Sequence, residues 1–214
     1  MAASIYLSFD DGPGPSTPAL LDVLRAGSCQ AMFFLLGANL ERDPLTAVRI
    51  AREGHVLGNH TYTHARAGAL SEAALIDEIK RTDALVRHAY QEAGVAAPAV
   101  IPLRLPYGLS EDDPRVHVLE RLGRLHTDWT LIMDDWQRPA PSALALLDTL
   151  RTHVARQRLL DERVLVCMHD SSRYGEARPA TVEALRMLLD GASFNGDGAF
   201  SDGASFNERG SFSN

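Results

Sequence analysis

Short apolar segments with the composition of β-strands alternate with amphipathic segments along most of the 214-residue chain. The first three strand-like segments cover residues 4–9, 31–36 and 56–58, and helical patterns occupy residues 44–52 and 71–93. The segment 31–36 is apolar at every position, which is typical of a strand covered on both faces. This alternation predicts parallel strands joined by crossover helices.

The alternation continues with weaker signals in the second half of the chain. We expect strands at 100–103, 125–127, 131–133 and 163–168, and helices over 112–122, 141–158 and 179–189. In the first half, Ser16 or Thr17 can cap a further helix after the first strand. A complete eight-unit barrel usually needs about 250 residues. The chain is shorter, so the expected α/β fold is a distorted or incomplete (β/α) barrel of parallel strands with outer helices.

The C-terminal end is a tandem repeat. Residues 190–201 read DGASFNGDGAFS, and residues 202–213 read DGASFNERGSFS. Two copies are too few for a stable solenoid. We therefore expect one domain over residues 1–189 and a peripheral or flexible tail over residues 190–214, with an added edge strand as the alternative for the tail.

Composition and charge argue against several classes of partner. The net charge of -7 argues against general affinity for nucleic acid or anionic membranes. No segment approaches the roughly 20 apolar residues of a membrane span, and no obligate protein partner is evident.

Cys29 and Cys167 are expected to be free thiols. The first residues lack a charged n-region, which favours a cytoplasmic location, with secretion after removal of a leader as the alternative.

Two histidines follow the strand-like segment at residues 56–58. His60 and His64 are four residues apart, and on a helical turn this spacing would place both imidazoles on one face. A pair of this kind can bind one metal ion, although many histidines serve only packing or solvation. The position directly after a strand favours the metal site, because α/β proteins place their sites there.

Two adjacent carboxylates follow the first strand-like segment. Consecutive side chains of a strand point to opposite faces, so Asp10 and Asp11 can face one site only if the strand ends there. Gly12 and Pro13 provide that break. One carboxylate would ligate a metal, and the other would take a proton from the bound water. A solvated turn is the equally good structural alternative.

Further polar residues follow the later strand-like segments. Arg104 could pair with a site carboxylate and hold its pKa down, and Gly108 would allow a ligand close to the backbone. Asp135 could orient that arginine, and Trp136 could form an apolar wall. His169 is placed to protonate a leaving amine. Each position also has an ordinary structural explanation as a turn, a core residue or a helix-cap neighbour.

The remaining histidines stand outside these segments and are expected to be surface or packing residues: His55, His88, His117, His126 and His153.

The segments FDDGP, NHTYTH, RLPYG, DDW and MHD occur in this order at the ends of successive expected strands. Together they resemble the polysaccharide deacetylase family, also called the NodB-homology domain or carbohydrate esterase family 4. The resemblance covers residues 5–189. Each segment alone is a weak signal, whereas five in order are specific. The resemblance implies a distorted (β/α) barrel that holds one divalent ion, usually zinc, with cobalt, nickel or manganese as alternatives.

The resemblance also implies a role for each motif residue. Asp10 matches the catalytic base. Asp11, His60 and His64 match the metal ligands of a site that leaves one position open for water. Arg104 matches the arginine that pairs with the base.

The later motifs complete the expected machinery. The backbone N–H of Tyr107 matches the group that stabilises the oxyanion, and Tyr107 is also expected to contact the substrate. Asp135 and Trp136 match the motif that supports the arginine and walls the pocket. His169 matches the general acid.

The chain departs from the family pattern at three places. Ile132 stands where the family often has an acid, and Cys167 stands where a leucine commonly lines the acetyl pocket. We therefore expect Cys167 to contact the acyl group and to loosen its fit. The repeats after residue 189 replace the usual apolar last strand, which leaves closure of the barrel open.

The expected activity is metal-dependent deacetylation of N-acetylhexosamine oligo- or polysaccharides, with short chito-oligosaccharides favoured. The first alternative is a hydrolase of the same superfamily that acts on a small cyclic amide or ureide. A non-heme iron oxygenase is the second, because two histidines and one carboxylate also suit Fe(II). A catalytically idle sugar-binding module is the third.

Overall fold

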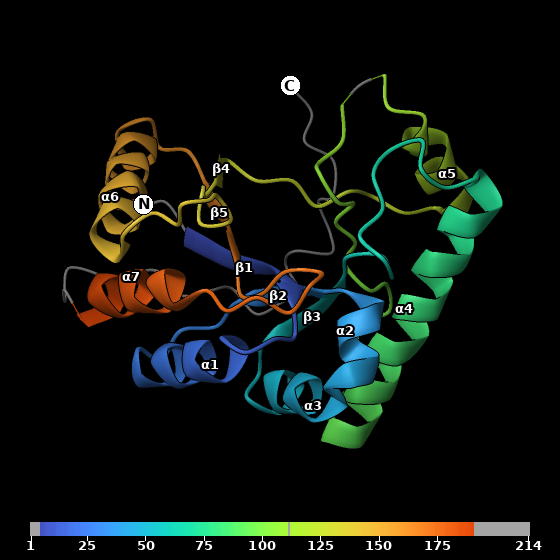
Figure 1. Ribbon diagram of the computed structural model, residues 1–214, viewed down its shortest axis with the longest axis horizontal. Helices are drawn as coiled ribbons and strands as arrows, with labels where there is room; N and C mark the ends of the chain where they lie inside the picture. Colours follow the sequence, from blue (N-terminus) through green and yellow to red (C-terminus); the bar gives the residue numbers. More distant parts are fainter. Residues whose placement is uncertain (1–4, 111, 191–214) are drawn as a thin grey trace.

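The computed structural model describes residues 5–110 and 112–190. Its centre is a five-stranded sheet in the order β3-β2-β1-β5-β4, and every neighbouring pair is parallel (Figure 1). The strands are β1 (Ile5–Gly12), β2 (Met32–Leu35), β3 (Val56–Asn59), β4 (Leu131–Ile132) and β5 (Val164–His169). The expected parallel α/β architecture is therefore confirmed.

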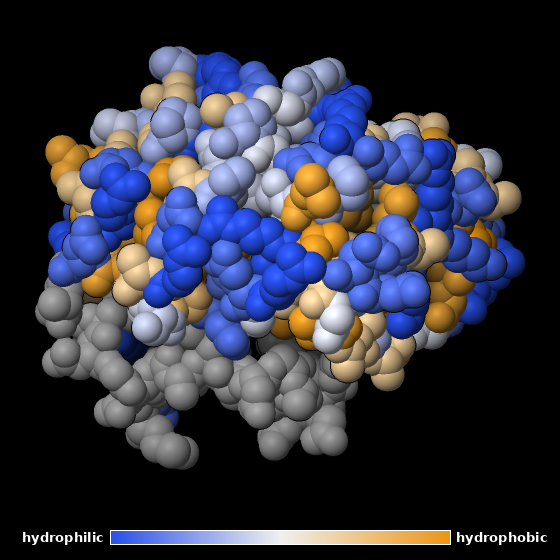
Figure 2. Space-filling view, turned by 90° about the horizontal axis from the view of Figure 1, so that it is seen from below, coloured by the Kyte–Doolittle hydropathy of each residue, from blue (hydrophilic) through white to orange (hydrophobic). Residues whose placement is uncertain are grey.

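Helices connect the strands and lie around the sheet. They are α1 (Thr17–Ala26), α2 (Gly37–Arg42), α3 (Pro44–Arg52), α4 (Glu72–Ala93), α5 (Arg115–Leu122), α6 (Ala143–Leu159) and α7 (Pro179–Asp190). Figure 1 shows α1 and α3 below the sheet, α6 and α7 on one side, and the long α4 on the other. The surface seen from below is largely hydrophilic, with separate hydrophobic areas (Figure 2).

Alternate strand residues bury one face of the sheet against the helices. Phe9, Phe33, Leu57 and Val166 all belong to the main hydrophobic core. The rings of Phe9 and Phe33 stack with their centroids 5.1 Å apart. Burying a side chain of this size stabilises the fold by about 1.5–3 kcal/mol, so this face fixes the register that sends the intervening residues to the opposite face.

The opposite face encloses a polar interior. Single bridges, Asn59 with Leu103 and Leu103 with His126, extend the sheet beyond β3. Arg104 crosses the enclosed space, because its guanidinium donates hydrogen bonds both to Ser8 Oγ on β1 (2.8 Å) and to the carbonyl of Thr127 (2.9 Å). The strands and bridges therefore curve around a buried arginine, as expected of an incomplete barrel.

Several elements differ from the sequence prediction. The expected strands at 100–103 and 125–127 are reduced to single bridges at Leu103 and His126. Proline at position 102 has no N–H to donate to a ladder. The helix expected from residue 112 begins at Arg115, whose N–H is bound by the Asp113 carboxylate (2.9 Å). The short helix α2 was not predicted.

Other expectations are confirmed or remain predictions. Cys29 and Cys167 are free and buried, as expected. Among residues 5–110 and 112–190, no helix is long and apolar enough to cross a membrane. The repeat at 191–214 lies outside the described residues, so the proposed boundary between domain and tail stays a prediction.

His55 gives the fold a specific pH dependence. Its side chain is only 4% exposed, and its Nδ1 accepts a hydrogen bond from the N–H of Ala31 (3.2 Å). Burial lowers the pKa of His55 from 6.5 to about 4. The imidazole therefore stays neutral in the folded protein at a pH where the unfolded chain binds a proton.

We expect the free energy of unfolding to fall as the pH is lowered from 6.5 towards 4, by up to about 3 kcal/mol from His55 alone. The variant His55→Gln keeps an acceptor but does not titrate, so its stability should depend less on pH. Urea unfolding at several pH values measures the difference. His126 is also buried and titrates in both proteins, so its contribution cancels when their stabilities are compared. Stability curves that run parallel with pH in the wild type and the variant would contradict the assignment to His55.

Candidate metal centre and catalytic site

A backbone irregularity turns two adjacent carboxylates towards one site. Strand β1 continues through Asp11 to Gly12, but its register against β2 shifts between Asp10 and Gly12. Asp11 has a φ of 73°, in the left-handed region. His60 Nε2 consequently lies 3.8 Å from Asp10 Oδ2 and 3.5 Å from Asp11 Oδ1. The strand, expected over residues 4–9, runs on to Gly12, where the sequence predicted the break, and a bulge at Asp11 brings the carboxylates together.

Asp11, His60 and His64 form a group that can hold one metal ion. One ligand atom from each residue lies within 4.8 Å of the others. His64 Nε2 is 3.2 Å from Asp11 Oδ1, and His60 Nε2 is 3.5 Å from the same oxygen. The structure therefore brings the three predicted ligands together, and a two-histidine, one-carboxylate set leaves a tetrahedral zinc one position for water.

The two histidines do not lie on a helical turn, so that part of the prediction is wrong. They belong to the loop that follows β3, in which Thr61 and His64 have φ values of 64° and 60°. The ring centroids of His60 and His64 are 5.1 Å apart. The left-handed residues, and not helical periodicity, place both imidazoles beside Asp11.

Hydrogen bonds at Nδ1 orient both imidazoles. His60 Nδ1 lies 2.8 Å from the carbonyl oxygen of Arg104, and a carbonyl can only accept, so this nitrogen carries the proton. His64 Nδ1 lies 3.2 Å from the hydroxyl of Tyr107. Burial, followed by the charge of His60, lowers the pKa of His64 to about 3. The Nε2 lone pairs are thus available for a metal ion.

The surroundings of Asp11 fit a cation. Its Oδ1 is buried and has no hydrogen-bond partner among the described residues. Burial raises the pKa of Asp11, and the charges of His60 and His169 only partly oppose this. A buried carboxylate oxygen without a partner costs free energy. A divalent ion between this oxygen and the two Nε2 atoms would remove that cost.

Asp10 is paired with Arg104, as predicted. Both side chains are buried, and Arg104 Nη1 donates a hydrogen bond to Asp10 Oδ1 (2.7 Å). Burial alone would raise the pKa of Asp10. The charge of Arg104, aided by His60, His169 and the hydrogen bond, outweighs burial and lowers this pKa. Asp10 is therefore ionised at neutral pH.

Asp135 supports His169, so the prediction that it orients Arg104 is wrong. Its Oδ1 lies 2.7 Å from His169 Nδ1, and its Oδ2 accepts bonds from the His169 N–H (2.9 Å) and the Thr181 hydroxyl (2.8 Å). Burial lowers the pKa of His169. The hydrogen bond and charge of Asp135, with the charges of Asp11 and Asp10, outweigh burial and raise it to about 9.

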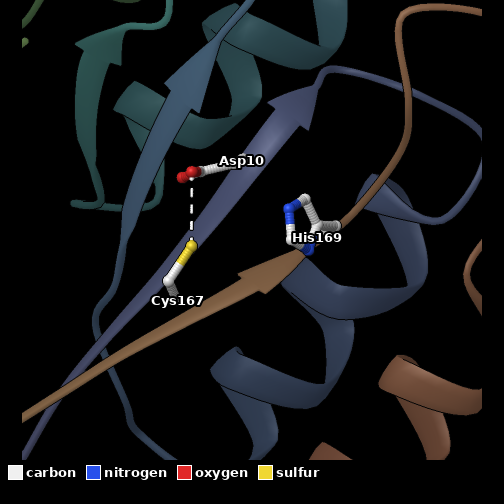
Figure 3. Close-up of side chains that lie close together, drawn as sticks. All are labelled: Asp10, Cys167 and His169. Carbon is white, nitrogen blue, oxygen red and sulfur yellow. Dashed lines mark hydrogen bonds between the residues drawn. The ribbon is translucent and has the colours of Figure 1, made fainter. Parts of the chain in front are cut away.

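Cys167 does not face a substrate pocket. It is 0% exposed and lies two residues before His169 on the same side of β5. Figure 3 shows its sulfur pointing at the carboxylate of Asp10, with Sγ 3.3 Å from Oδ2. The expectation that Cys167 contacts the acyl group is therefore corrected: this position lies beneath the base, inside the curved sheet.

Tyr107 and Trp136 lie at the surface of the site. Each is 49% exposed. Tyr107 has a φ of 64°, and its backbone N–H has no acceptor among the described residues. Its ring lies 4.7 Å from that of His64. Tyr107 thus contacts His64 of the proposed metal group. Trp136 is linked to the site only through its chain neighbour Asp135, which bonds to His169.

Asp170 is a site residue that the sequence analysis did not assign. It is completely buried, and it accepts a hydrogen bond from the Thr17 hydroxyl. A Cβ atom at Gly12 would collide with its carboxylate. Burial raises the pKa of Asp170 to about 7. Its position after His169 was visible in the motif MHD, but only the fold shows that it packs under the turn after Asp11.

In this parallel α/β fold, a two-histidine, one-carboxylate group lies beside two charged pairs, Asp10 with Arg104 and Asp135 with His169, an arrangement suited to metal-assisted hydrolysis. The sequence matches the description "Polysaccharide deacetylase" over residues 2–124, more than half of the chain. The chain belongs to the polysaccharide deacetylase family.

Individual relatives agree with this membership. A chitooligosaccharide deacetylase of Sinorhizobium fredii is 34% identical over 70% of this chain and 68% of its own length. A peptidoglycan-N-acetylglucosamine deacetylase of Bacillus cereus is 31% identical over 86% of this chain and 79% of its own. The structure of a family 4 carbohydrate esterase from Streptomyces lividans superposes with a TM-score of 0.69 at 27% identity, covering 88% of this chain and 86% of that one.

We expect one zinc ion to bind per chain, and we expect alanine at Asp11, His60 or His64 to weaken binding by more than about 100-fold, since changes to outer-shell partners alone cost about 10–100-fold. Isothermal titration calorimetry of chelator-treated protein measures this. The exposed His88 supplies the matched control His88→Ala. Undiminished affinity after replacement of both His60 and His64 would contradict the site.

Proposed function

We propose that this chain is a metal-dependent N-deacetylase that hydrolyses the acetamide of N-acetylhexosamine oligo- or polysaccharides and releases acetate. One observation carries the proposal: the group of Asp11, His60 and His64 lies beside an ionised carboxylate, Asp10, whose neighbour on the adjacent strand is a protonated imidazole, His169. Family membership supports a hydrolase of carbon–nitrogen bonds. The names of the relatives support a glycan substrate.

Asp11, His60 and His64 are the residues that would hold the ion, for which we propose zinc. When bound, a zinc ion supplies a water of lowered pKa and a Lewis acid that polarises the acetamide carbonyl. The fixed Nδ1 hydrogen bonds of His60 and His64 keep both Nε2 atoms directed at the ion.

Asp10 acts as the general base. Arg104 holds Oδ1, which leaves Oδ2 on the side of His60 Nε2, 3.8 Å away. With an ion held by Asp11, His60 and His64, this oxygen would be on the side of the attacking water and would accept its proton. The ion pair with Arg104 keeps Asp10 ionised before the reaction.

His169 acts as the general acid. Its pKa of about 9 keeps the imidazole protonated at neutral pH, and Asp135 holds it through Nδ1. The opposite nitrogen, Nε2, is free to give its proton to the sugar nitrogen as the carbon–nitrogen bond breaks. The products are acetate and the free amine of the sugar.

The backbone N–H of Tyr107 is placed to bind the developing oxyanion. It has no acceptor among the described residues, and the left-handed φ of 64° turns this peptide out of the regular pattern. One such donor typically lowers the barrier by about 3 kcal/mol.

The cavity beside Tyr107 favours a sugar over a small cyclic amide. Its volume is about 500 Å³, and its walls include Arg66, Asp128 and the aromatic side chains of Tyr107 and Trp129. Aromatic surfaces combined with a few polar groups are typical of ligand sites of this size. A cavity of this kind accommodates a neighbouring unit of an oligosaccharide.

We expect the purified protein to release acetate from N-acetylated chito-oligosaccharides and to lose this activity with a zinc chelator. A panel that also contains peptidoglycan and a cyclic ureide separates the possible substrates, with free acetate and ring opening as the readouts. Ring opening without acetate release would replace the proposal by the cyclic-amide activity. Dioxygen consumption would replace it by the oxygenase activity.

We expect Asp10→Asn and His169→Gln each to lower kcat by about 10²–10⁴-fold, because each removes one proton-transfer group. Zinc should still bind both variants, since neither residue belongs to the proposed ligands. Steady-state kinetics together with zinc content per chain measures both effects. Retention of full kcat in either zinc-loaded variant would exclude that residue from proton transfer.

A further inference from the structure

We propose that Glu78 of α4 is a positioning residue that holds the metal-ligating histidine loop in its binding conformation. This inference rests on the proposed metal site. Glu78 lies far from the motif residues in sequence, and it is half-buried between α4 and the loop. Its carboxylate makes three hydrogen bonds to Tyr62 and Thr63, the two residues directly before His64.

The histidine loop needs external support because its backbone is strained. Thr61 and His64 have φ values of 64° and 60°. Thr61 is β-branched, and a branched side chain is a true outlier in this region. Left-handed non-glycine residues are energetically unfavourable and persist only where their surroundings fix them. Without such contacts the loop would relax and separate the two Nε2 atoms.

Glu78 satisfies the donors of this loop. One carboxylate oxygen, Oε2, accepts the backbone N–H groups of Tyr62 and Thr63, each at 3.0 Å. The other oxygen, Oε1, accepts the hydroxyl of Thr63. Both oxygens are therefore occupied by the loop. Glu78 acts through the loop and not as a ligand.

The remaining contacts of the loop explain why Glu78 matters for its second half. The Asn59 side chain accepts the N–H of Thr61 (2.8 Å), and the N–H groups of Gly37 and Ala38 donate to the carbonyls of Thr61 (2.9 Å) and Tyr62 (3.1 Å). These contacts hold the loop as far as Tyr62. Among the described residues, the N–H and hydroxyl of Thr63 bond only to Glu78. Thr63 leads into His64, so loss of Glu78 should move His64 away from Asp11.

The test compares zinc affinity in variants that differ in this carboxylate. Glu78→Ala removes all three bonds, and we expect zinc affinity to fall about 10–100-fold. Glu78→Gln should stay within about threefold of wild type, because its amide oxygen can accept the two N–H groups and its NH₂ can donate to Thr63. Asp77→Ala is the matched control, since it removes the same charge from the next, exposed position of α4.

The readout is the zinc Kd of chelator-treated protein, by competition with a chromophoric chelator, at a temperature where the metal-free variant is folded. Under that condition a general loss of stability does not alter Kd. Thr63→Val removes only the hydroxyl bond and gives a smaller loss; it carries the test if Glu78→Ala does not fold.

Wild-type affinity in Glu78→Ala, or in Thr63→Val where Glu78→Ala is unfolded, would overturn the inference and leave the proposed function intact. An equal loss in Asp77→Ala would also overturn it, because the effect would then be one of charge. Failure of the wild-type protein to bind zinc would instead overturn the metal-dependent function itself.

Discussion

The left-handed backbone at Asp11 is the constraint on which the site depends. A regular strand would send Asp10 and Asp11 to opposite faces. Six described residues other than glycine have positive φ, and four of them are Asp11, Thr61, His64 and Tyr107. These four lie at one site and supply two proposed ligands, the loop between the histidines and the proposed oxyanion donor. Local strain is thus concentrated where the ligands converge, and packing around it maintains the geometry.

Different surroundings give the two adjacent carboxylates different properties. Arg104 compensates Asp10 inside the curved sheet, and the pKa of Asp10 falls. Asp11 has no such partner, so burial raises its pKa. Arg104 itself is held by main-chain carbonyls and by the ring of Phe34, 4.1 Å from its guanidinium carbon. The same sheet face therefore keeps Asp10, the proposed base, ionised, and leaves Asp11, the proposed metal ligand, without a charged partner of this kind.

Much of this arrangement follows from the sequence, because polar motifs at the carboxyl ends of parallel strands must meet at one edge. Asp10, Asp11, His60, His64, Arg104 and His169 do so. Contacts between side chains were less predictable. Asp135 bonds to His169 and not to Arg104, and Cys167 lies under Asp10, because the curvature of the sheet decides these partners. Glu78 carried no motif signal, since its partners are backbone N–H groups of a distant loop.

The most direct test of the account is a crystal structure of the zinc-loaded protein with anomalous scattering measured at the zinc edge. We predict one anomalous peak per chain, about 2.0–2.2 Å from a carboxylate oxygen of Asp11 and from Nε2 of both His60 and His64. The described residues contain a second possible metal-binding group, Asp10, Cys167 and His169. A peak at that group, or no peak between Asp11 and the two histidines, would contradict the account.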